Sequence, residues 1–195
     1  WSEGGTPAIP IPVAVRPQVA PDVLQAAARI LRSAEPAMLL LNGQVLCETG
    51  LLAAQRVAHA TGAKLRTSFF VSRMPCGGGR VPVAPVPYEI NAALKALEGL
   101  KHLFLVGAKP PVAFFAYPGK PSLILPKDCA MHVLVRPEQE AVVALQLLAD
   151  EVSAPSDVPI PKVGPGPHIA SGSFKPEAFA TTLAALLPEN AIVAE

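Results

Sequence analysis

Residues 37–43, Ala-Met-Leu-Leu-Leu-Asn-Gly, carry the strongest signal for the fold of this chain. Five apolar residues without a polar interruption predict a strand that is buried on both faces, as in a parallel sheet. The Asn42-Gly43 pair predicts a turn directly after the strand. A helical pattern follows as far as Thr61, and Gly62 stands where a left-handed residue closes a helix. The stretch therefore predicts a strand, a turn and a helix in succession.

The same alternation of strands and helices continues on both sides of this unit. Because most of the strands are apolar and helices separate them, we expect parallel strands joined by right-handed crossovers, with helices on both faces. The fold class is thus α/β: a Rossmann-like three-layer α/β/α sandwich with a mostly parallel sheet, spanning residues 21–151. The expected strands are 37–41, 64–70, 102–106, 122–125 and 130–135, and the expected helices are 23–33, 51–61, 90–97 and 138–151.

Proline-rich segments flank this domain. Residues 1–20 and 152–173 each hold several prolines, which disfavour helix and predict extended linkers. Residues 176–187 then predict a helix with Phe179 and three leucines on one face, and an apolar run at 191–194 predicts the start of a strand. We therefore expect a central domain of a larger protein, followed at 174–195 by the start of a truncated C-terminal domain.

The composition excludes several classes of partner. Of the 195 residues 51% are hydrophobic and only 16% are charged, which is typical of a domain that buries part of its surface against neighbours. The net charge of +1 comes without a basic tract, so nucleic acid is not expected. No apolar run is long enough to cross a membrane. Cys47, Cys76 and Cys129 form no C-x-x-C pair, which indicates reduced thiols and a cytoplasmic protein.

One crevice can be predicted, at the carboxyl ends of the strands. In open parallel sheets, ligands bind at this edge, and anions bind at the following helix N-termini. The pattern G-x-G-x-x-G is absent, so a dinucleotide site and a plain strand-to-helix turn both remain open. The candidate cofactor-binding residues at this edge are Asn42, Gly43, Gln44, Thr67, Gly107 and Lys109.

No catalytic or metal site can be assigned from the residues. The four histidines are scattered over different predicted elements, and no nucleophile motif of the G-x-S-x-G type accompanies them. Neither paired metal ligands nor an H-E-x-x-H motif occurs. We therefore expect the chain by itself to be catalytically inactive.

The organisation resembles the central domain of thiamine-diphosphate-dependent enzymes such as acetolactate synthase and benzoylformate decarboxylase. The resemblance lies in residues 37–43, in residues 51–67 (LLAAQRVAHATGAKLRT) and in residues 94–107 (LKALEGLKHLFLVG). Residues 1–21 resemble the exit from the N-terminal, pyrimidine-binding domain of those enzymes. Residues 174–195 resemble the opening of their C-terminal, diphosphate-binding domain, and Leu187 to Val193 match its first strand.

This resemblance implies a parent enzyme that binds thiamine diphosphate and magnesium and acts on 2-keto acids. Its partners would be the N- and C-terminal domains of the same chain, assembled as a homo-oligomer. The activating glutamate and the magnesium motif of the family belong to those other domains, so this chain alone should not bind the cofactor. Some relatives bind FAD or ADP in the central domain, but residues 73–87 lack the pattern of the flavin-binding members.

Two other functions stay open from the sequence. The sheet and its crevice are also typical of a nucleotide-binding module for FAD, ADP or NAD. The low charge is also compatible with a dimerisation module.

Overall fold

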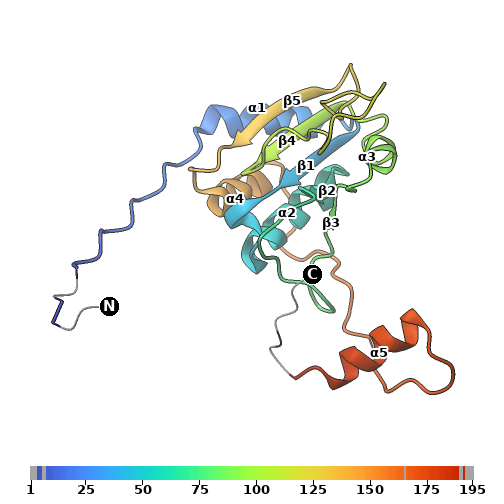
Figure 1. Ribbon diagram of the computed structural model, residues 1–195. Coiled ribbons are helices and arrows are strands. Elements are labelled where there is room, and N and C mark those ends of the chain that lie inside the picture. The colour runs from blue at the N-terminus through green and yellow to red at the C-terminus, as the bar shows by residue number, and fades with distance from the viewer. Residues whose placement is uncertain (1–3, 6–7, 165, 189–190, 192–195) are drawn as a thin grey trace.

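A five-stranded, all-parallel sheet forms the centre of the molecule (Figure 1). The computed structural model describes residues 4–5, 8–164, 166–188 and 191. The strand order β3-β2-β1-β4-β5 confirms the predicted α/β class with parallel strands. The strands are β1 (Ala37–Leu41), β2 (Lys64–Thr67), β3 (Ala84–Pro85), β4 (His102–Val106) and β5 (Ala130–Val135).

The apolar run at residues 37–41 becomes the central strand β1. It pairs in parallel with β2 on one side and with β4 on the other, and all five of its residues are buried. Leu39 and Leu41 face one core of the domain, and Met38 and Leu40 face the other. A polar residue at any of these positions would lie in an apolar core, which explains the uninterrupted sequence.

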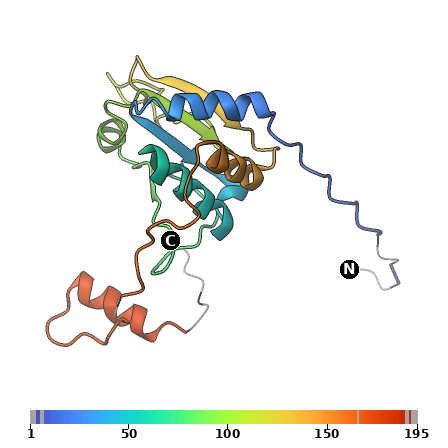
Figure 2. The same ribbon diagram turned by 180° about the vertical axis from the view of Figure 1, so that it is seen from behind.

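Helices cover the two faces of the sheet unequally. In Figure 2, the helices of one layer lie in front of the sheet, and they bury their apolar sides with Leu39, Leu41 and Phe104. The opposite face is covered by one short helix and by the irregular segment 107–129, so that Val133 there is 54% exposed. The three-layer arrangement is confirmed. The helices on the fuller face are α1 (Pro21–Leu31), α2 (Glu48–Thr61) and α4 (Ala141–Glu151), and α3 (Ile90–Ala96) covers the other.

Three sequence predictions about strands differ from the structure. The second strand ends at Thr67 rather than at residue 70, and Val86 then donates a hydrogen bond to the Thr67 carbonyl, which brings the unpredicted β3 to the edge. The predicted strand at 122–125 is wrong, because only Leu123 forms an isolated antiparallel bridge, with Val112. Prolines at 121 and 126 flank that run and remove backbone donors, so it cannot join a ladder.

The helix at residues 176–186 lies away from the sheet (Figures 1 and 2), whereas Val152 and Val158 in the segment before it are buried. Within the described part of 152–173 there is no helix or strand, and α5 (Pro176–Leu186) follows. The predicted helix is present, but Phe179 and Leu186 on its apolar side are 54% and 65% exposed. Of the strand predicted at 191–194, residues 192–194 lie outside the described residues.

Candidate functional site

The carboxyl ends of β1, β2 and β4 meet at one edge of the sheet. The amide of Asn42 donates a hydrogen bond to the Val106 carbonyl at 3.0 Å, and the amide of Ser68 donates to the Leu41 carbonyl at 3.3 Å. Gly107 in turn donates to the carbonyl of Val135 in β5, at 2.9 Å. The turns that follow these strands are therefore neighbours.

The Asn42-Gly43 turn begins the short 3-10 helix η1 (Gly43–Val45). The side-chain oxygen of Asn42 accepts a hydrogen bond from the Gly43 amide at 2.7 Å, so it caps this helix. The half-buried Gln44 donates its side-chain amide to the carbonyl of Gln139, just before α4. Both polar side chains of this turn are thus engaged in holding the local backbone.

Gly107 brings the backbone of the β4 turn against that of the β1 turn. Its φ is +63°, and a Cβ atom built there would lie 2.6 Å from the carbonyl oxygen of Asn42. Only glycine fits this position. The exposed Lys109 lies two residues further along the chain, beyond the close contact.

Thr67, the last of the predicted site residues to be described, is buried. It is 1% exposed, it pairs with Leu41 in the sheet, and its hydroxyl has no hydrogen-bond partner among the described residues. Asn42 and Gly107 therefore meet directly at the edge, and Thr67 ends the neighbouring strand below it. The Gln44 side chain is hydrogen-bonded to the Gln139 carbonyl, and Lys109 is exposed to solvent.

Replacing Thr67 by valine should raise the free energy of unfolding by about 1 kcal/mol, because a buried hydroxyl without a partner carries a desolvation cost of about 1–3 kcal/mol. Valine keeps the shape and replaces the hydroxyl by a methyl group. Chemical denaturation of both proteins measures the change, and Thr49→Val, at an exposed threonine in α2, is the matched control. A loss of stability in T67V would show that the hydroxyl has a partner.

The structure reveals an aromatic cluster, here Phe69, Phe70, Tyr88, Phe114 and Phe115, that the sequence analysis missed. These residues follow the ends of β2, β3 and β4, and neighbouring ring centroids lie 4.6–6.5 Å apart. Four of the five side chains are 46–63% exposed. The available signal was the two Phe-Phe pairs, one at the end of the predicted strand 64–70 and the other between predicted strands. An exposed aromatic cluster of this kind is typical of a contact surface.

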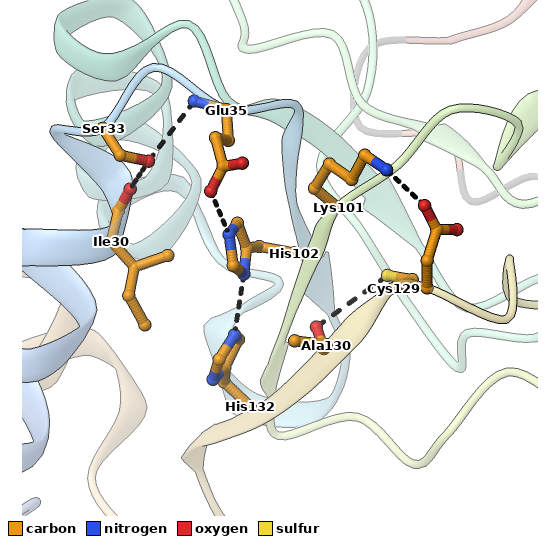
Figure 3. Close-up of polar contacts among 9 residues, drawn as sticks. Ile30, Ser33, Glu35, Lys101, His102, Cys129, Ala130 and His132 are labelled. Carbon is orange, nitrogen blue, oxygen red and sulfur yellow. Dashed lines mark hydrogen bonds and ion pairs between the residues drawn. The ribbon is translucent and has the colours of Figure 1, made fainter.

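A polar cluster of Glu35, His102 and His132 lies toward the amino ends of β4 and β5, at the end of the sheet opposite to the aromatic cluster (Figure 3). The Nε2 atom of His102 lies 3.0 Å from a carboxylate oxygen of Glu35, and its Nδ1 atom lies 3.1 Å from Nε2 of His132. The ring of His132 also stacks on Phe104, with centroids 4.8 Å apart. Burial, and then the positive charge of a protonated His102, lower the pKa of His132.

The lowered pKa of His132 makes the free energy of unfolding depend on pH. Because the folded-state pKa of His132 is lowered, the unfolded chain binds its proton first as pH falls below about 6.5, and the free energy of unfolding decreases in that window. His132→Asn should flatten the decrease between about pH 7.5 and 5.5. Denaturation at both pH values measures it, and His59→Asn, at an exposed histidine, is the control. Equal slopes in H132N and the parent chain would contradict the prediction.

Metal and membrane sites find no support in the described residues. No group of three or more histidine, cysteine, aspartate or glutamate side chains gathers there as metal ligands. None of the helices in the described ranges combines the length and the apolar character that a membrane span requires.

Comparison with known proteins finds relatives of this chain. No family model matches the chain. It is 39% identical over its full 195 residues to "Putative acetolactate synthase large subunit IlvX" of Mycobacterium tuberculosis (strain ATCC 25618 / H37Rv), covering 37% of that protein. The chain is a relative of the thiamine-diphosphate-dependent enzymes of the acetolactate synthase and benzoylformate decarboxylase type.

Two solved structures of other proteins share the fold. A "putative thiamin diphosphate-dependent enzyme" from Mycobacterium smegmatis matches 95% of this chain and 39% of its own, with 21% identity and a TM-score of 0.62. The "thiamine diphosphate-dependent 4-hydroxybenzoylformate decarboxylase" of Rhodococcus jostii RHA1 matches 93% of this chain and 37% of its own, with 20% identity and a TM-score of 0.62. The chain thus spans less than two fifths of the length of its relatives.

Proposed function

We propose that this chain is the central, structural domain of an enzyme that uses thiamine diphosphate and magnesium to act on 2-keto acids in the manner of acetolactate synthase. The identity with the Mycobacterium tuberculosis protein, over about a third of that protein's length, supports this role. The five-stranded parallel sheet, shared with two enzymes of the family, agrees with it. In this proposal the domain does not act catalytically by itself.

The residues of the chain do not fit magnesium diphosphate. Magnesium prefers carboxylate and other oxygen ligands around a phosphate group, and no such acidic group is gathered in the described ranges. At the carboxyl edge of the sheet, the side chains of Asn42 and Gln44 are already hydrogen-bonded to backbone groups. We therefore assign the cofactor, and the chemistry that it supplies, to the N- and C-terminal domains of the parent enzyme.

The domain contributes packing surface instead. The aromatic cluster at the carboxyl edge and the apolar side of α5 both expose large side chains, with Phe70 at 63% and Leu186 at 65%. Contact with a neighbouring domain would remove these surfaces from water, at about 25 cal/mol per Å² of apolar area. We assign the aromatic cluster and α5 as the contacts of this domain with the rest of the enzyme.

A chimaera tests this role. The 195 matching residues of the Mycobacterium tuberculosis protein are replaced by this chain, and thiamine-diphosphate binding and 2-keto acid consumption are measured. We expect the chimaera to bind the cofactor and the chain alone to bind none. Leu39→Asp in the chimaera is the control, because it places a charge in the fully buried central strand. Binding of thiamine diphosphate by the chain alone, or a folded chimaera that does not bind it, would refute the proposal.

A nucleotide-binding module is the second candidate function. The observation that favours it is the buried, unpartnered hydroxyl of Thr67 beneath the meeting point of Asn42 and Gly107. Titration with FAD, ADP and NAD tests it, because a ligand at ten times its dissociation constant stabilises the folded state by about 1.4 kcal/mol. The stabilisation should disappear in T67V, and no shift with any nucleotide would eliminate this candidate.

A further inference from the structure

The segment that follows α4 is packed onto the domain along its first half. Val158 is 6% exposed and belongs to the core between the sheet and the helices α1, α2 and α4. The Arg56 side chain, from α2, donates hydrogen bonds to the carbonyls of Ala154 at 3.2 Å and Pro155 at 3.0 Å. Residues 152–158 therefore follow the surface of the domain instead of leaving it at the end of α4.

The end of this segment is in contact with a run of three glycines in the loop after β2. The Gly79 amide donates a hydrogen bond to the Pro161 carbonyl at 3.0 Å. A Cβ atom built at Gly78 would lie 3.0 Å from the Cα atom of Val163, and one built at Gly79 would lie 3.3 Å from the Val163 side chain. Two backbones can approach this closely because glycine has no side chain. The glycine run thus fits the end of the segment backbone against backbone.

The loop that carries these glycines also carries part of the aromatic cluster. Phe70 precedes the glycines and Tyr88 follows them, and their ring centroids lie 6.2 Å apart. Between the glycines and Tyr88, Val81 and Val83 are buried in the same core as Val158. The loop therefore connects the aromatic cluster at the carboxyl edge with the place where the chain leaves the domain.

We propose that residues 152–163 are a fixed part of this domain, and that the loop of Gly77 to Gly79 is an exit clamp that sets where the chain leaves it. The connection to α5 then consists of residues 164–173 alone. A chain extends by at most about 3.3–3.6 Å per residue, so this connection spans no more than about 35 Å. A connection that began at residue 152 would span about twice that distance. The exit clamp therefore keeps α5 near the carboxyl edge.

The consequence of the exit clamp for the enzyme rests on the proposed function. In that proposal, the aromatic cluster and α5 are contacts between this domain and the rest of the enzyme. The effective concentration of two tethered surfaces falls roughly as the −3/2 power of the tether length, so halving the tether raises it about threefold. The exit clamp is thus a device that favours docking of the C-terminal domain close to the aromatic cluster.

Amide hydrogen exchange of the 195-residue chain, measured residue by residue by NMR, tests the exit clamp. Relative to their intrinsic rates, we expect Gly79 to exchange at least about tenfold more slowly than Gly78, because the Gly79 amide is the one that donates to Pro161. Gly78→Val should remove this protection, because its side chain would displace Val163. Equal exchange at Gly78 and Gly79 in the parent chain, or protection that survives in G78V, would overturn the proposal.

Gly164→Val is the matched control for this substitution. Neither Gly78 nor Gly164 has a positive φ, and nothing lies within 4 Å of a Cβ atom built at Gly164. The two variants therefore differ in the contact with Val163 and not in backbone strain. G164V should keep the slow exchange of Gly79, and thermal unfolding of both variants verifies that they fold.

Thermal unfolding of a further pair of variants gives a second readout that does not involve the glycines. If residues 152–163 are fixed in solution, Val158→Ala should lower the Tm by about 4 °C, because buried methyl groups are lost. Val163→Ala is the control, because Val163 is 74% exposed and its truncation should leave the Tm within about 1 °C of the parent value. A Tm that V158A leaves unchanged would mean that the segment is detached, and would overturn the proposal.

These two readouts use the chain alone, so they test the exit clamp whether or not the proposed function is correct. The consequence for the enzyme is tested in the chimaera. There, G78V should lower the rate of 2-keto acid consumption about threefold relative to G164V, in line with the longer tether. Equal rates in the two chimaeras, with the protection of Gly79 lost in G78V, would overturn the link between the exit clamp and the C-terminal domain.

Discussion

Replacing Phe104 by alanine is expected to lower the free energy of unfolding by about 3–5 kcal/mol, the usual cost of removing a buried phenylalanine. Phe104 is fully buried in β4, next to Leu39 of the central strand. Its ring stacks on His132 and belongs to the core that α1 and α4 share with the sheet. Since small domains are stable by about 5–15 kcal/mol, this one change would remove a large part of the total.

The packing around Phe104 explains why the loss should be at the upper end. Phe104 lines a hollow between α1 and β5, so alanine would join the new cavity to a space that already exists. The cost of a large-to-small change rises with the cavity that remains, because the surroundings relax only in part. The stacking contact with His132 would be lost as well.

Chemical denaturation of the parent chain and of F104A measures this effect. Phe174→Ala is the matched control, because Phe174 is 83% exposed and its loss should change stability by no more than about 0.5 kcal/mol. A loss below about 1.5 kcal/mol in F104A would mean that the core between α1 and the sheet collapses onto the vacated site.

The elements that the sequence predicts correctly are those in which local pattern and burial agree. The run at 37–41 is buried on both faces, and Gly62 ends α2 with a φ of +74°. The structure differs from the sequence prediction at segments where prolines interrupt the pattern of apolar residues. The two-residue strand β3 contains Pro85 and forms only because it lies at the sheet edge, a position that no local signal gives.

The candidate site could be predicted only as far as strand order allows. Asn42 and Gly107 meet because β1 and β4 are neighbours. The sequence places both residues at the carboxyl ends of parallel strands, which is where ligands bind in open sheets, but it does not give the strand order. The contacts among Glu35, His102 and His132 could not be predicted. They depend on the pairing of β4 with β5 and on the position of the turn after α1, which join residues far apart in the sequence.

Replacing Gly107 by alanine is the other change with a large expected effect, a loss of about 2–5 kcal/mol. Two costs add. An L-residue at a φ of +63° costs about 1–2 kcal/mol, because the side chain crowds its own carbonyl group. The new methyl group would also lie 2.6 Å from the Asn42 carbonyl oxygen, and forcing such a group into a packed site costs about 1–3 kcal/mol.

Gly62→Ala separates these two costs. Gly62 has a similar φ of +74°, but nothing lies within 4 Å of a Cβ atom built there, so only the backbone cost of about 1–2 kcal/mol applies. Denaturation of G107A and G62A in parallel therefore gives two losses of unfolding free energy. The difference between them is the cost of the close contact between residue 107 and the Asn42 carbonyl. Equal losses would mean that the turn after β1 moves freely away from Gly107. A larger loss in G107A would mean that the two turns are held together, because Asn42 also donates its amide to Val106 at 3.0 Å. The edge of the sheet would then be a rigid surface.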